Sequence, residues 1–153
     1  LAAACVREDE SALRARMAQW FWIGDTLAFH AEAGCAAAVF RLTAPDIKSA
    51  MPVAGSAGEM LVHLRRTGRA ALRARDQSPD QGLVDIVNRD RPMGMAMRRA
   101  ALEGRGCMDV GAEDAFLRGL KGARSVLAWH GQSGAIMILD PDRGLALVAI
   151  GAE

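Results

Sequence analysis

Hydrophobic residues change their spacing along this chain, and the change predicts two kinds of secondary structure. Between residues 59 and 121 they recur mostly every three or four positions, which is the period of an amphipathic helix. From residue 125 onward they alternate with a period of two in runs rich in Val, Ile and Leu. The pattern therefore predicts a helical middle followed by strands.

The C-terminal part predicts three strands, over residues 125–130, 135–139 and 145–150. The first two are joined by a Gln-Ser-Gly turn and the second pair by Pro-Asp-Arg-Gly. Because connections this short force neighbouring strands to run in opposite directions, the three strands form an antiparallel meander.

The helical signals vary in strength. The clearest is Ser78-Pro79-Asp80-Gln81, where Ser78 caps the helix, Pro79 suits its first position and Gln81 completes a capping box. A similar but shorter signal, Thr43 to Asp46, predicts a brief helix that ends at Pro52. The period predicts the other helices over residues 7–23, 59–76, 91–103 and 109–121.

Residues 26–42 allow two interpretations. They are rich enough in Ala to form a helix. They also alternate around His30 and Glu32, and Gly34 sits where a hairpin would turn. The alternation favours the hairpin. With it, the chain is an α+β protein: an antiparallel sheet, made of the C-terminal meander and the N-terminal hairpin, with helices packed on one face.

Composition fits one folded domain over residues 7–153, since 51% of the 153 residues are hydrophobic and 24% are charged. The formal net charge is +1 and aromatic residues make up 5%. Neither value favours nucleic-acid binding, which relies on positive charge and stacking rings. The sequence contains no apolar run of the roughly 20 residues that a membrane-spanning helix needs.

The first residues, Leu1-Ala2-Ala3-Ala4-Cys5, resemble the end of a bacterial lipoprotein signal peptide. The resemblance implies that residues 1–6 are a signal or anchor remnant, that Cys5 carries lipid, and that the protein lies in the periplasm, anchored to a membrane. The alternative is an Ala-rich helix start in a cytoplasmic protein.

Export would also determine the state of the other two cysteines. Cys35 and Cys107 remain as an even pair, and in an oxidising periplasm such a pair predicts one disulfide. In the cytoplasm all three cysteines would instead be small buried side chains.

Three arginines, Arg65, Arg69 and Arg73, are spaced four residues apart within the helix expected over residues 59–76. This spacing predicts a basic stripe that could bind anionic lipid headgroups or an acidic partner. The competing interpretation is a solvated helix face, because acidic residues nearly balance the basic ones.

Two clusters contain residue types that can bind copper or act in nucleophilic catalysis, but the arrangement of neither is sufficient to predict that role. Met93, Met95 and Met97 offer the soft sulfur atoms that Cu(I) prefers, although only Met93 and Met97 would share a helix face. The hairpin would bring His30, Glu32 and Cys35 together, as nucleophilic catalysis requires, but a disulfide would consume the thiol. We therefore assign no catalytic residue, metal ligand or cofactor.

These observations predict a non-enzymatic protein of the bacterial envelope that binds a partner protein or a membrane assembly. The alternative is a carrier of a small ligand or of copper, or an enzyme whose pocket has no recognisable motif.

Overall fold

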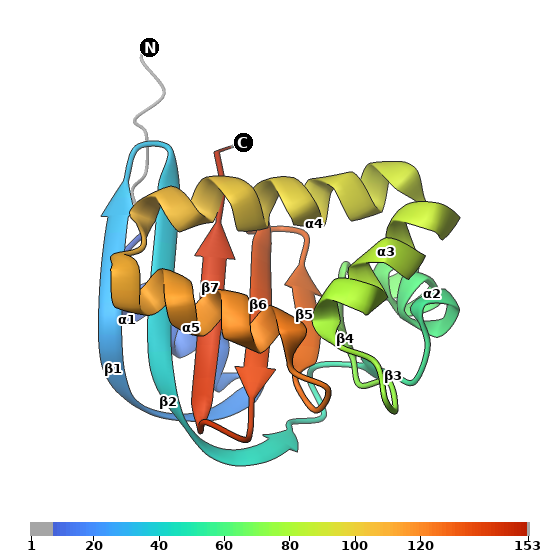
Figure 1. Cartoon of the computed structure of the whole chain (residues 1–153), viewed down its shortest axis with the longest axis horizontal. Coiled ribbons are helices and arrows are strands. Elements are labelled where there is room, and N and C mark those ends of the chain that lie inside the picture. The colour runs from blue at the N-terminus through green and yellow to red at the C-terminus, as the bar shows by residue number, and fades with distance from the viewer. Residues whose placement is uncertain (1–7, 153) are drawn as a thin grey trace.

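The computed structural model describes residues 8–152 and has an α+β fold built on a sheet of seven strands, shown in Figure 1. The strands lie in the order β1-β2-β7-β6-β5-β4-β3. They are β1 (Phe21–Glu32), β2 (Cys35–Ile47), β3 (Val53–Ala54), β4 (Arg69–Leu72), β5 (Val126–His130), β6 (Ala135–Asp140) and β7 (Leu145–Ile150). The helices are α1 (Glu10–Ala18), α2 (Ala57–Thr67), α3 (Pro79–Arg89), α4 (Arg91–Gly104) and α5 (Val110–Lys121), with a short 3-10 turn, η1 (Arg105–Cys107).

The two predicted strand units are confirmed and lie side by side in the sheet. β1 and β2 form a hairpin in which Glu32 lies opposite Cys35. β5, β6 and β7 form the antiparallel meander. β2 pairs with β7, with Val39 opposite Leu147, so the N-terminal hairpin and the C-terminal meander form one continuous sheet.

Three of the predicted helices are confirmed, and each begins with a capping side chain. The hydroxyl of Ser78 accepts a hydrogen bond from the backbone N–H of Gln81, and the Gln81 side chain completes the capping box. The carboxylates of Asp90 and Asp109 cap α4 and α5 by accepting hydrogen bonds from the backbone N–H groups of Met93 and Ala112. Local side-chain chemistry is sufficient to place these helix starts.

Two other helix predictions are wrong in their extent. The helix expected over residues 59–76 ends at Thr67, because Gly68 adopts a left-handed conformation (φ 75°) that terminates it. The chain then forms β4, which pairs with β5. The helix expected over residues 7–23 ends at Ala18, and β1 begins at Phe21.

The short helix expected from Thr43 is also absent. Residues 43–47 instead continue β2, and Phe21 lies opposite Ile47. Pairing with the start of β1 satisfies the backbone of this segment, so its cap-like residues never begin a helix.

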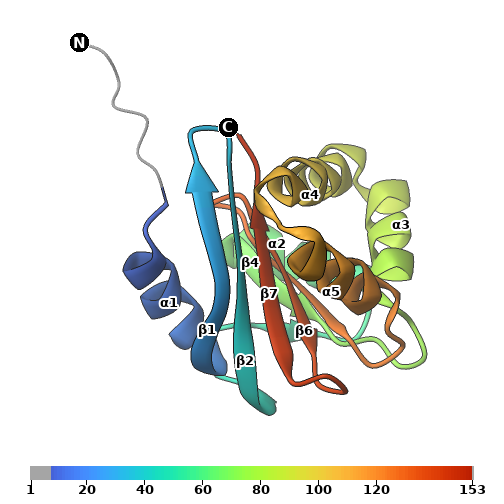
Figure 2. The ribbon, with the colours of Figure 1, turned by 60° about the vertical axis from the view of Figure 1, so that its left-hand side comes forward.

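The sheet separates two hydrophobic cores. Helices α2 to α5 pack on one face, as predicted. The remaining helix, α1, lies on the opposite face, where Leu13 and Met17 are buried (Figure 2). We refer to these as the helix face and the α1 face.

No helix within residues 8–152 has the length and apolar character needed to cross a membrane. Cys5, the predicted lipidation site, lies outside the described residues.

Candidate functional site

A disulfide joins the hairpin to the helical layer. Cys35, the first residue of β2, is bonded to Cys107 at the end of η1, with a Cα–Cα distance of 5.8 Å. This confirms the predicted pair. Because such bonds persist mainly in oxidising compartments, the disulfide indicates an extracytoplasmic location.

A histidine and a carboxylate lie beside this bond. His30 and Glu32 are two residues apart on β1, so both side chains project from the same side of the strand. His30 Nε2 lies 2.8 Å from Glu32 Oε1. The predicted grouping of His30, Glu32 and Cys35 is therefore present, but the Cys35 sulfur is already bonded and offers no nucleophilic thiol.

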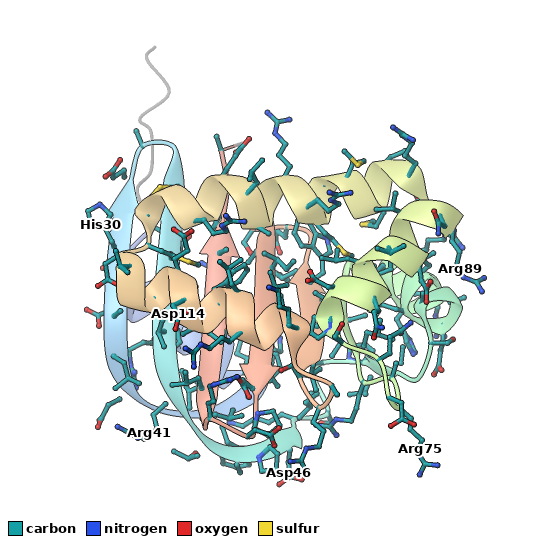
Figure 3. All side chains as sticks on the ribbon, viewed as in Figure 1. His30, Arg41, Asp46, Arg75, Arg89 and Asp114 are labelled. Atoms are coloured by element: carbon teal, nitrogen blue, oxygen red, sulfur yellow. A yellow bond between two sulfur atoms is a disulfide. The ribbon has the colours of Figure 1, made fainter. Side chains whose placement is uncertain are left out.

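A hollow of about 420 Å³ opens next to the cluster and is bordered by His30, Cys107 and Asp109. His30 lies where the sheet ends near the β1–β2 turn, close to the segment that joins α4 to α5 (Figure 3). The donor atoms of His30, Glu32 and Cys107 all lie within 4.8 Å of one another. The imidazole and the carboxylate are thus exposed to solvent, and the sulfur of Cys107 lies buried beneath them.

The three arginines do not form the predicted helical stripe. Arg65 is on α2, Arg69 is on β4, and Arg73 follows β4. The Arg69 Nε donates to the carbonyl of Ala50, and an Nη of Arg73 donates to the carbonyl of Pro45, each at 2.7 Å. Arg69 thus holds the segment between β2 and β3, Arg73 holds the end of β2, and a role of the three arginines in binding anions stays a prediction.

The methionines of α4 point in different directions. Met97 is fully buried in the core, and Met93 packs against that core. Met95 is 43% exposed. The sulfur atoms of Met95 and Met97 thus lie on opposite sides of the helix surface, which does not favour a shared copper site.

His130, at the end of β5, occupies a second polar cluster on the α1 face. Its ring centroid lies 4.8 Å from that of Trp20, and its Nδ1 lies 2.6 Å from the Ser133 hydroxyl. Burial lowers the pKa of His130, and the positive charges of Arg16 and Arg69 lower it further. Near neutral pH the uncharged imidazole of His130 is therefore the favoured form.

A groove of about 960 Å³ runs along α4. One wall is α4 itself, and others come from α3, α5, the β5–β6 turn and the chain around Gly151. The side chain of Trp129 forms part of its lining. We refer to this cavity as the α4 groove.

The α4 groove combines exposed apolar side chains with arginines. Met95 and Leu102, two helical turns apart, lie along one side of α4, and Leu102 is 67% exposed. The charged residues of the lining are Arg98, Arg99, Arg105 and Asp80. The lining is therefore mainly apolar and has three arginines to one aspartate, and two of those arginines also pair with carboxylates beside the groove: Arg99 with Glu103 (2.7 Å) and Arg105 with Glu113 (3.6 Å).

Sequence reasoning missed this groove because its lining comes from five segments that are far apart in the sequence. The one local signal is the spacing of Met95, Arg98 and Leu102 on α4 and of Arg105 at its C-cap, which places apolar and basic side chains on adjoining stripes. Nothing in that spacing indicates a cavity beside them.

No protein-family model, curated protein or solved structure matches this chain.

Proposed function

We propose that this protein is a non-enzymatic binding module of the bacterial envelope, and that its α4 groove holds an acidic, amphipathic segment of a partner protein. The observation that carries the proposal is the composition of the groove: exposed apolar side chains flanked by three arginines and one aspartate. An acidic amphipathic helix or strand matches both features.

The exposure of apolar side chains along the groove supports a macromolecular partner over an enclosed small molecule. Leu102 keeps two thirds of its surface exposed (67%). Large apolar side chains exposed beside a hollow are typical of surfaces that a partner covers. A long segment lying along α4 would bury Leu102 and Met95 together.

The residues of the groove are better suited to binding than to catalysis. Its polar side chains are the four charged residues together with Gln132 and Ser133. The described lining contains neither a thiol nor an imidazole, the groups that most often act as nucleophile or base near neutral pH. The disulfide supports a location in the periplasm, where such a module would meet envelope proteins, and lipid on Cys5 would hold it at a membrane.

Site-specific photo-crosslinking in the native envelope tests the proposal. A photo-reactive amino acid at position 102 should yield one dominant crosslinked partner, and mass spectrometry should place the crosslink in an acidic segment. The matched control is position 62, since Val62 is also an exposed apolar residue (48%) on a helix but lies outside the groove.

Binding of the purified partner segment then provides the quantitative test. Leu102→Asp should weaken binding at least tenfold, because it places a carboxylate against an acidic ligand in an apolar contact. Val62→Asp should leave the affinity unchanged. Equal crosslinking from positions 62 and 102, or unchanged binding by Leu102→Asp, would contradict the proposal.

A second candidate, a carrier of a small acidic amphiphile, is favoured by the cavity volume alone. About 960 Å³ lies at the upper end of the range typical of small-molecule sites. Recovery of the protein from the envelope as a monomer that retains an apolar acid, identified by native mass spectrometry, would favour this function.

A further inference from the structure

We propose that reduction of the Cys35–Cys107 disulfide converts this end of the sheet into a zinc site whose ligands are Cys35, Cys107, His30 and Glu32. The site is distinct from the α4 groove and independent of the function proposed for it. In the disulfide form the same residues hold no metal tightly, because a bonded sulfur is not a thiolate.

The residue types are those that zinc selects. Structural zinc sites are tetrahedral and use thiolate sulfur, imidazole nitrogen and carboxylate oxygen. All three kinds converge here from two separate parts of the chain, the hairpin and η1. The hairpin alone supplies His30, Glu32 and Cys35, and its register places Glu32 directly opposite Cys35.

The distances fit a metal after small side-chain movements. Zinc bond lengths of about 2.0–2.3 Å place neighbouring ligand atoms of a tetrahedron about 3.3–3.8 Å apart. The donor atoms of His30, Glu32 and Cys107 already lie within 4.8 Å of one another. The side chains of His30 and Glu32 are 57% and 60% exposed, so both are free to rotate toward an ion.

The two cysteines are also positioned for a shared ion. Their Cα atoms are 5.8 Å apart, and the backbone on both sides is held by the sheet and by α4 and α5. The hollow of about 420 Å³, which His30 and Cys107 both line, gives an ion and its hydration water an approach to the buried Cys107 sulfur.

The conversion balances with a dithiol as the reductant. The dithiol transfers two electrons and becomes a disulfide, while Cys35 and Cys107 become thiols. One Zn²⁺ then binds both sulfurs as thiolates and releases two protons. A metal bridge thus replaces the covalent bridge between the hairpin and η1. In the reverse step a reactive disulfide takes up two electrons and two protons and becomes a dithiol, the cysteines form their disulfide again, and the ion is released.

Metal titration of both redox forms tests the proposal with Zn²⁺ and Co²⁺ as the only probes. The reduced protein should bind one Zn²⁺ per chain in competition with a chromogenic chelator. Its Co²⁺ complex should show the charge-transfer absorption of thiolate ligands. The oxidised protein should bind Zn²⁺ at least a hundredfold more weakly, since it offers only an imidazole and a carboxylate.

Single substitutions identify the two ligands that do not come from the disulfide. In the reduced protein, His30→Ala and Glu32→Gln should each weaken zinc binding at least tenfold. The control is His63→Ala, because His63 also lies near a glutamate, with its Nε2 3.7 Å from Glu59 Oε1, but forms no cluster with a cysteine among residues 8–152. His63→Ala should bind zinc like the unmodified chain.

Circular dichroism of the tryptophans separates loss of the site from loss of the fold. A reduced chain that unfolds and refolds only with Zn²⁺ supports the proposal, and one that stays unfolded with Zn²⁺ contradicts it. Equal zinc affinity of the oxidised and reduced forms, or unchanged affinity in both His30→Ala and Glu32→Gln, would also overturn it.

Discussion

The two faces of the sheet are covered in different ways. On the helix face, glycines let helix backbones come close to the strands: a Cβ at Gly104 would lie 2.6 Å from the Cβ of Ala149. On the α1 face, the part of the chain that the structure describes has one helix, of nine residues, attached by large side chains, chiefly Leu13 and Met17. Arg14 adds hydrogen bonds from α1 to Gly24 and Thr26 of β1.

The contrast indicates how each face should respond to mutation. A contact made by large side chains is lost when one of them is shortened, because a cavity remains. A contact made by closely approaching backbones is lost when an atom is added, because neither side can yield without moving. The α1 face should therefore be sensitive to truncation and the helix face to enlargement.

Truncation on the α1 face should have the largest effect. Met17 is fully buried, and Met17→Ala should lower the free energy of unfolding by about 2–5 kcal/mol. Chemical denaturation of the oxidised protein measures the change. Val62→Ala, a truncation of an exposed side chain, is the control and should change stability by less than about 0.5 kcal/mol. Similar values for the two variants would mean that α1 contributes little to the fold.

The helical layer has a covalent link to the hairpin, and within residues 8–152 both cysteines belong to it. Removal of this disulfide should lower the free energy of unfolding by about 2–4 kcal/mol, since the bond closes a loop spanning 72 residues in the unfolded chain. Cys35→Ser and Cys107→Ser should each lower the melting temperature, and the double variant should be no less stable than the single ones. Additive losses would show that each thiol has a separate role. These measurements require metal-free buffer, because zinc binding is proposed for the reduced pair.

Enlargement on the helix face should have an intermediate effect. Gly104→Ala places a methyl group against Ala149 and should cost about 1–3 kcal/mol. Gly111→Ala is the matched control in another helix, where the nearest atom would be 3.6 Å away, an ordinary contact. That control should be neutral or stabilising by up to about 1 kcal/mol. A neutral Gly104→Ala would remove the distinction between the two faces.

The elements that sequence predicted correctly carry their own local signals. The Ser78 capping box and the period-two runs of the meander determine structure within a few residues. β4 lacks such a signal, because Arg69-Ala70-Ala71-Leu72 has little preference by itself. Pairing with β5 and burial on both faces make it a strand. Pairing and burial are tertiary effects. The helical spacing of hydrophobic residues, which continues past Gly68 in the sequence, could not reveal them.

The same distinction applies to the candidate sites. The register of the hairpin, and with it the grouping of His30, Glu32 and Cys35, follows from alternation around Gly34. Cys107 was paired with Cys35 by counting cysteines and not from any local pattern. The α4 groove could not be predicted, because its volume depends on how five segments pack. Sequence thus predicted residues that lie within one hairpin better than it predicted a surface made by several elements.

The smallest effect expected on the α1 face comes from the protonation of His130. Because its pKa in the folded protein lies below the ordinary value of 6.5, the unfolded chain binds the proton more readily. The contribution of His130 to the free energy of unfolding should therefore be constant above about pH 7.5. It should decline as the pH falls through 6.5 toward the folded-state pKa.

The loss should be less than about 1 kcal/mol, because His130 is only partly buried and water screens the arginine charges. Urea unfolding between about pH 7.5 and pH 5.5 measures it. His130→Asn removes the titrating group and should flatten the pH dependence in this window, whatever its effect on stability at pH 7.5. If the variant loses as much stability on acidification as the unmodified chain, another group is responsible. An NMR titration that places the imidazole pKa at or above 6.5 would likewise rule out His130 as the source.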